Sequence, residues 1–232
     1  MLWKISGTYR KVCLNTGGNR DESMLFYGNR KLPLMVKAFI EKASFKADYI
    51  FMIYTFGMSE TVARPNAISV MEKAGKKLDY VNTVKMVDNY LPGFEMKEQI
   101  ETAGKKKIEE QIDQVCRDIA SRKVNVTGTG IGDKIGMAMI RGTMGKMIFK
   151  RTAAQEYIVT NDCIKCGICA KVCPADNITV EDRPHFADRC EVCYACVHHC
   201  PKNAIHLKNE KSSARFRNEN VSVSEIIKAN EG

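Results

Sequence analysis

The sequence of 232 residues predicts two folds in one chain: an α/β layer with a doubly wound parallel sheet, and a small α+β module after it. The first prediction rests on alternating strand-like and helical segments before residue 124. The second rests on eight cysteines gathered between residues 163 and 200. We therefore expect four parts, listed in order: an incomplete α/β domain (1–123), a connector (124–156), the cysteine-bearing domain (157–208) and a tail (209–232).

Within the α/β part, residues 48–56 (DYIFMIYTF) form a nearly continuous apolar run that ends at Gly57. Such a run is typical of a strand buried on both faces of a parallel sheet. Pro33 and Pro65 each stand at a favourable first position of a helix, and Gly75 is well placed to end the second one. The remaining expected elements are strands at 1–5, 24–28 and 78–87, and one long amphipathic helix marked by Met96, Ile100, Ala103, Ile108, Ile112, Val115 and Ile119.

Two cysteine motifs share one spacing. The first consists of Cys163, Cys166, Cys169 and Cys173 before Pro174, and the second of Cys190, Cys193, Cys196 and Cys200 before Pro201. Both read C-x2-C-x2-C-x3-C-P, the run that holds 4Fe-4S clusters in bacterial ferredoxins. Zinc also binds thiolates, but its sites usually pair two CxxC units across a long gap. The third cysteine and the C-P ending favour iron and sulfide.

In this run the first three cysteines surround one cluster and the fourth ligates the other cluster. Cluster 1 is therefore assigned to Cys163, Cys166, Cys169 and Cys200, and cluster 2 to Cys173, Cys190, Cys193 and Cys196. With an offset of 27 residues, Ile178 matches Ile205 and Val180 matches Leu207. The repeat predicts a pseudo-twofold βαββαβ module in which the clusters supply much of the folding energy, because the apolar core is small.

Net charge and hydropathy limit the expected binding partners and cellular location of the protein. The formal net charge is +9, but Lys and Arg are spread along the whole chain, which favours a solvated basic surface over a nucleic-acid site. Redox partner proteins with an acidic docking surface are the useful alternative. No run of eighteen apolar residues and no signal-peptide stretch is present, so we expect no membrane insertion and a cytoplasmic protein with reduced thiols.

Residues 157–207 resemble bacterial two-cluster ferredoxins, and the longer stretch from Leu32 resembles the flavodoxin–ferredoxin fusion proteins of anaerobes. The matching segments are LPLMVKAFIEK, YIFMIYTFG, VKMVDNYLPG, CYACVHHCPKNAI and ARFRNENVSVSEIIKAN. The resemblance implies a flavodoxin-like domain in which roughly a third, at the N-terminal end, is missing or replaced. A four-stranded sheet could survive this loss, because the second flavodoxin strand is an edge strand.

The resemblance also implies residues for flavin mononucleotide (FMN). Ser6, Gly7 and Thr8 match only the opening of the flavodoxin phosphate loop, and the glycine and hydroxyl residues expected next are absent. The flavin rim would be formed by Thr55, Phe56, Gly57 and Asn89. Ordinary turns and sheet ends explain these four residues equally well. We therefore expect two 4Fe-4S clusters, and weak or no binding of FMN.

The leading hypothesis is an electron-transfer iron–sulfur protein that relays single electrons to or from a flavin or a partner oxidoreductase. The alternative is an FMN-dependent reductase whose clusters feed the flavin. A third class is a binding module in which the clusters only hold the fold. The sequence favours a carrier over a stand-alone enzyme, and leaves its partners open.

Overall fold

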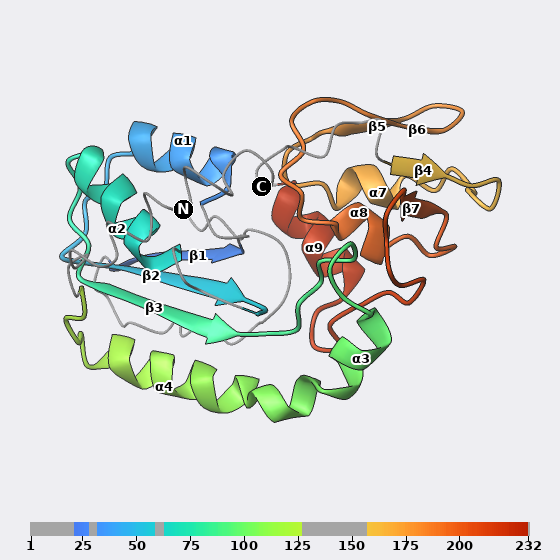
Figure 1. The fold of residues 1–232 in the computed structure, drawn as a ribbon. Helices are drawn as coiled ribbons and strands as arrows, with labels where there is room; N and C mark the ends of the chain where they lie inside the picture. Colours follow the sequence, from blue (N-terminus) through green and yellow to red (C-terminus); the bar gives the residue numbers. More distant parts are fainter. Residues whose placement is uncertain (1–20, 28–31, 59–62, 127–156, 232) are drawn as a thin grey trace, which may run out of the picture. The chain divides into compact units, whose positions relative to one another are not determined.

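The computed structural model describes residues 21–27, 32–58, 63–126 and 157–231 (Figure 1). They fall into two compact units. The sheet unit contains the described residues up to Met86 together with 107–126, and the cysteine unit contains 87–106 and 157–231. The expected strand at 1–5 and most of the expected connector lie outside the described residues. No helix in these ranges is long and apolar enough to cross a membrane.

The sheet unit is built on three parallel strands in the order β1-β2-β3, with bounds β1 (Asp21–Tyr27), β2 (Tyr49–Phe56) and β3 (Tyr80–Lys85). Tyr49 pairs with Asp21, and Phe51 pairs with Tyr80. Residues 49–55 of the central strand are all buried, which confirms a strand covered on both faces. Within the described residues this sheet has three strands rather than four.

Helices cover both faces of this sheet. The helices α1 (Leu34–Lys42) and α2 (Ala63–Lys73) lie on one face, and α4 (Ile108–Ala120) lies on the other (Figure 1). The buried apolar side chains of the three helices are Val36 and Ile40, then Ala67, Ile68 and Met71, then Ile112, Val115 and Ile119. After α2 the chain turns at Gly75, whose φ is +66° and whose N–H donates to the Glu72 carbonyl at 3.0 Å. This is the helix end that the glycine predicts.

The prediction of one long helix from Met96 to Ile119 is wrong. The structure has a short helix α3 (Met96–Glu101), a 3-10 turn η1 (Ala103–Lys106) and then α4. Lys107 separates η1 from α4 with a left-handed backbone, at φ 50°. The break also separates the units, because α3 belongs to the cysteine unit and α4 to the sheet unit. The apolar periodicity continues across the break because α3 and α4 each bury an apolar face, in different units.

The cysteine unit has the predicted βαββαβ order. Its elements are β4 (Tyr157–Val159), α7 (Ile168–Lys171), β5 (Ile178–Val180), β6 (Pro184–Phe186), α8 (Ala195–His198) and β7 (Ile205–Leu207). Strand β4 pairs antiparallel with β7, and β5 pairs antiparallel with β6. The offset of 27 residues places Ile178 and Ile205 at the starts of equivalent strands.

Two segments outside the motifs complete the core of the cysteine unit. Val87, Leu91 and Met96 are buried in the same cluster as Tyr194 and the strand residues of β7. At the other end of the chain, α9 (Val223–Asn230) starts with a capping box between Ser222 and Glu225. Its Ile226 packs against Val172 and Ala195. The two segments that carry the cysteines, 163–173 and 190–200, are called the cysteine loops below. Residues that precede them and residues that follow them in the sequence both pack against them.

Candidate metal centre

The two cysteine loops share an uncommon backbone conformation. Lys165, Gly167 and Asp176 have φ values of 58°, 76° and 46°. The residues 27 positions later, Val192, Tyr194 and Asn203, have φ values of 57°, 58° and 48°. Left-handed residues within a turn direct successive N–H groups toward one side and create a concave binding site for anionic groups. The repeat seen in the sequence therefore extends to the local backbone geometry around each cysteine group.

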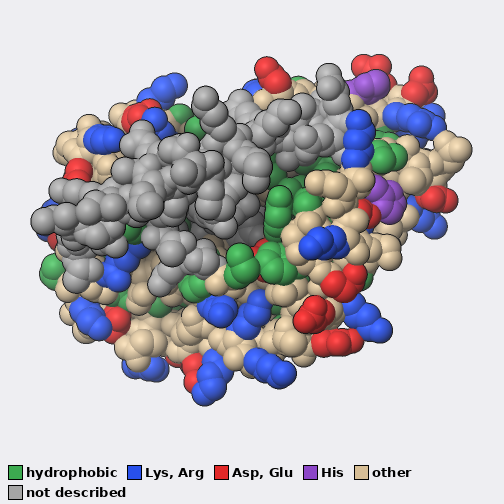
Figure 2. Space-filling view, viewed as in Figure 1, with side chains coloured by type: hydrophobic (Ala, Val, Ile, Leu, Met, Phe, Trp, Pro, Cys, Tyr) green, Lys and Arg blue, Asp and Glu red, His purple; other side chains and the backbone are tan. Residues whose placement is uncertain are grey.

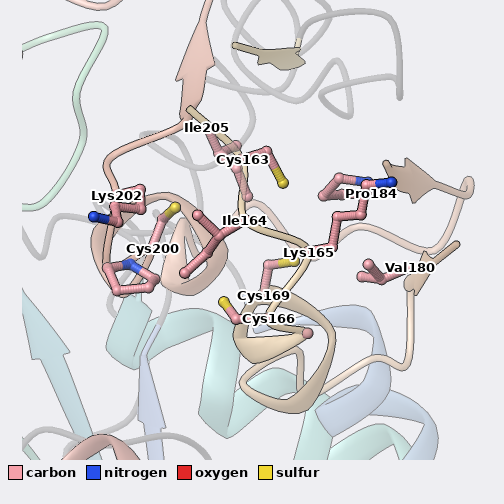
Figure 3. Close-up of a pocket in the computed structure, with 12 residues that line it drawn as sticks. Cys163, Ile164, Lys165, Cys166, Cys169, Val180, Pro184, Cys200, Lys202 and Ile205 are labelled. Atoms are coloured by element: carbon pink, nitrogen blue, oxygen red, sulfur yellow. The ribbon is translucent and has the colours of Figure 1, made fainter. Parts of the chain in front are cut away.

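The first group of cysteines surrounds one pocket. Its lining includes Cys163, Cys166 and Cys169 from one loop and Cys200 from beyond α8 (Figure 3). Ile164, Val180, Pro184 and Ile205 supply apolar surface around the sulfurs, and Lys165 and Lys202 also line the pocket. Burial, with repulsion from Cys166, Cys163 and Cys200, raises the pKa of Cys169 to about 11. These four cysteines therefore lie close enough to act as one donor set.

The second group contains Cys173, Cys190, Cys193 and Cys196, of which Cys196 is buried. Burial, with repulsion from Cys173 and Cys190, raises the pKa of Cys193 to about 12. Burial also raises the pKa of Cys196, and its neighbours Cys193, Cys190 and Cys173 add to this effect, followed by Cys169 of the first group. The Tyr157 hydroxyl lies 3.3 Å from the Cys190 sulfur. Cys173, from the first motif, is thus an electrostatic neighbour of three cysteines from the second motif.

Backbone N–H groups donate to the sulfurs at equivalent positions of the two halves. The Asn177 N–H donates to Cys173 Sγ at 3.3 Å, and the Ala204 N–H donates to Cys200 Sγ at 3.2 Å. In each case the donor follows four residues after the last cysteine of a motif. Such hydrogen bonds stabilise thiolate charge and are among the factors that set the potential of an iron–sulfur cluster.

The residues present fit an iron–sulfur group. Eight thiols sit in two groups. Burial together with repulsion from neighbouring cysteines disfavours deprotonation of Cys169, Cys173, Cys193 and Cys196 unless a cation neutralises them. Iron ions supply the positive charge that neutralises the thiolates, and the thiols lose their protons when the metal binds. In the part of the chain that the structure describes, no three His, Cys, Asp or Glu residues converge as they would on a single ion. The first four sulfurs surround a shared pocket instead, which suits a larger group.

His198 connects three segments around the second group. It is only 2% exposed, and burial lowers its pKa to about 4. The Phe216 N–H donates to its Nδ1 at 3.2 Å, so the ring proton resides on Nε2 and is donated to the Asn89 carbonyl at 3.0 Å. Arg217 from the tail donates to the carbonyls of His198 at 2.8 Å and Cys200 at 2.7 Å. The tail is therefore bonded directly to the end of the second motif.

The residues expected on the flavin rim lie in different units. Ser6, Gly7 and Thr8 are outside the described residues. Thr55, Phe56 and Gly57 follow one another at the carboxyl end of β2, where Thr55 is buried and the other two are half-buried. Asn89 belongs to the cysteine unit, and its side-chain amide donates to the Cys193 carbonyl at 3.3 Å. Asn89 is therefore engaged by a cysteine loop.

Sequence reasoning missed the residues that hold the cysteine loops from outside. Asn89, Phe216 and Arg217 all contact the second motif, although none is a cysteine or lies near one in the sequence. His198 carried a signal, because it stands inside the motif itself, as does His199. An interior histidine in a cysteine run predicts hydrogen-bonding partners, but its partners cannot be identified before the chain is folded.

Comparison with known proteins agrees with this geometry. Residues 162–205 match the family model described as a 4Fe-4S dicluster domain. A 69-residue alignment is 36% identical to NADH-quinone oxidoreductase subunit I 2 of Geobacter metallireducens, covering 25% of this chain and 53% of that protein. The match thus spans about half the length of this relative. No solved structure matches the chain. Residues 162–205 form an iron–sulfur module of the ferredoxin type.

Proposed function

We propose that this chain relays single electrons through two 4Fe-4S clusters. Cluster 1 is held by Cys163, Cys166, Cys169 and Cys200, and cluster 2 by Cys173, Cys190, Cys193 and Cys196. The observation that carries the proposal is the position of the last cysteine of each motif. Cys200 lines the pocket of the first loop, and Cys173 is an electrostatic neighbour of the second group. When bound, such clusters accept and release one electron at a time without forming or breaking a bond to the protein.

The chain's own residues hold the cysteines and exclude water from them. The buried side chains around the sulfurs lower the local dielectric, and the backbone N–H donors offset the negative charge of the thiolates. Anaerobically purified protein should contain about eight iron and eight sulfide ions per chain. Dithionite should reduce it, and voltammetry should find negative potentials. A positive potential, or a cluster that dithionite does not reduce, would contradict a low-potential carrier.

The partner is proposed to be a larger redox enzyme with an acidic docking surface. The relative from Geobacter metallireducens is named as a subunit of an NADH-quinone oxidoreductase. Lys165 and Lys202 line the pocket of the first group, and the chain retains a positive charge of about +5 after two clusters of about −2 each are counted against +9. Figure 2 shows Lys and Arg interspersed with Asp and Glu on the visible face.

A second candidate is an FMN-dependent reductase of flavodoxin-like fold. The position of Thr55, Phe56 and Gly57 favours it, because ligands of parallel α/β sheets bind beyond the carboxyl ends of the strands. The hydrogen bond from the Asn89 side chain to the Cys193 carbonyl favours the carrier instead, because it engages a residue that was expected on the flavin rim. Flavin quantified in the same anaerobic preparation separates the two: we expect little FMN. Stoichiometric FMN with turnover of an electron acceptor would establish the reductase.

A further inference from the structure

The two cysteine loops carry different residues at one equivalent left-handed position. Gly167 and Tyr194 each follow the second cysteine of their motif, with φ values of 76° and 58°. Glycine adopts this left-handed conformation freely, whereas the Cβ of tyrosine approaches the following carbonyl oxygen too closely. A bulky residue stays in this conformation only where its surroundings hold it there. At this position the second loop therefore needs contacts that hold Tyr194 in its conformation, whereas Gly167 in the first loop does not need them.

Residues 87–91 supply contacts at this position. The Asn89 side-chain amide donates to the Cys193 carbonyl at 3.3 Å, and that carbonyl belongs to the peptide that joins Cys193 to Tyr194. The ring of Tyr90 contacts the ring of Tyr194 in a tilted arrangement, with centroids 6.0 Å apart and an interplanar angle of 42°. One hydrogen bond and one aromatic contact thus hold the peptide and the side chain of the strained residue.

The segment is itself anchored within the cysteine unit. The Asn89 carbonyl accepts the His198 Nε2 proton at 3.0 Å, and the Leu91 carbonyl accepts the Lys211 N–H at 3.0 Å. Val87 and Leu91 are buried in the core that contains Cys196. A side chain on such a fixed backbone can hold a partner in one orientation, because few of its own conformations remain to be lost.

We propose that residues 87–91 form a clamp on the second cysteine loop, with Asn89 as the positioning residue for the Cys193–Tyr194 peptide. In a trans peptide the C=O and N–H point in opposite directions. Fixing the Cys193 carbonyl toward Asn89 directs the Tyr194 N–H away from Asn89, so the clamp sets which N–H groups face the cysteine sulfurs. These hydrogen bonds tune the electronic environment of the cluster bound there. The inference rests on the proposed function, because it requires that the second group of cysteines binds cluster 2.

The test compares three variants as holoproteins: Asn89→Ala, Asn89→Gln, and Asn89→Ala combined with Tyr194→Gly. The measurement is NMR of the paramagnetically shifted cysteine β-protons, first in the oxidised protein and then during a redox titration. Asn89→Ala should move the signals of Cys193 and Cys196 and lower the potential of cluster 2, while the signals of Cys163 and Cys166 stay in place. Adding Tyr194→Gly should return the signals part of the way to the parent pattern, since glycine needs no clamp although the buried Tyr194 ring is lost. Asn89→Gln, which keeps an amide donor, should restore it in part.

Asn230→Ala is the matched control, because the Asn230 amide donates to a backbone carbonyl of the first half, that of Lys171, at 2.9 Å. It should leave the Cys193 signals unchanged. Equal shifts at both cysteine groups in Asn89→Ala, or none at either, overturn the clamp. If Asn89→Ala does not assemble its clusters, Asn89→Gln decides, because the proposal requires that the retained amide donor restores assembly at least in part. Clusters that show the expected oxidised-state shifts but cannot be reduced overturn the proposed function and leave the clamp supported.

Discussion

Cys200 lies at the same pocket as Cys163, although the two residues belong to different cysteine motifs. The pocket is closed only when the second motif returns to the first through β7, which pairs with β4 directly before Cys163. The two halves of the module therefore depend on each other for their ligands, and a ligand lost from one motif should be felt in the other half.

Replacing Cys200 with alanine should remove the cluster of the first loop and spare most of the second, because Cys200 completes the first donor set. Cys173→Ala is the reciprocal variant and should remove the cluster of the second loop. Iron content should fall by about half in each variant. Mössbauer and EPR spectra identify the cluster that remains; loss of the second loop's cluster in Cys200→Ala would refute the exchanged assignment.

Removing iron with a chelator should unfold the cysteine unit. The cysteines are part of its buried core, and the strands β4 to β7 have only three residues each. Without metal this small core is insufficient to keep the loops folded. Hydrogen exchange should show loss of protection at Ile205 and Leu207, while amides of β2 in the sheet unit keep theirs. Retained protection at Ile205 after complete iron removal would show that the core suffices alone.

Replacing Lys107 with glycine should stabilise the sheet unit by about 1 kcal/mol, since Lys107 adopts a left-handed backbone at the start of α4. Its exposed ion pair with Glu110 contributes little. Glu109→Gly, inside α4, is the control and should cost about 1 kcal/mol. Urea unfolding measures both. A destabilised Lys107→Gly protein would mean that the helix runs on without a break.

Stability of the sheet unit should fall in acid through Asp118. Burial alone would raise the pKa of this carboxyl, but hydrogen bonds from Lys123, Gln114 and Tyr80 outweigh it and place the pKa below its ordinary 3.8. A lowered pKa means that the stabilisation is complete above 3.8 and is lost as the pH falls through the lower folded value. Hydrogen exchange at β3 and α4 should show this loss.

Asp118→Asn tests that assignment. It should be less stable than the parent near neutral pH, and the difference between the two should shrink as the pH falls below 3.8. Asp113→Asn, an exposed carboxylate on the same helix, is the matched control and should change little. A constant difference between Asp118→Asn and the parent across the acid range would place the titration elsewhere.

Several features of the fold were predictable from the sequence. The buried strand around Tyr54 was evident from its apolar run, and the end of α2 was evident from Gly75. The spacing of the cysteines predicted the βαββαβ order and the repeat of 27 residues. These features depend on neighbours in the chain: side-chain periodicity, glycine at positive φ, and the reach of a short cysteine loop.

Other features required the folded chain. Apolar periodicity could not reveal the break at Lys107, because both sides of the break continue to bury one face. The resemblance to a flavin loop could not reveal that Asn89 donates to Cys193, since that bond joins residues 104 positions apart. The sequence by itself determined that this chain carries an iron–sulfur module, because metal ligation follows local spacing. Only the tertiary structure decided which residues support its loops, because long-range hydrogen bonds exist only after the segments have packed together.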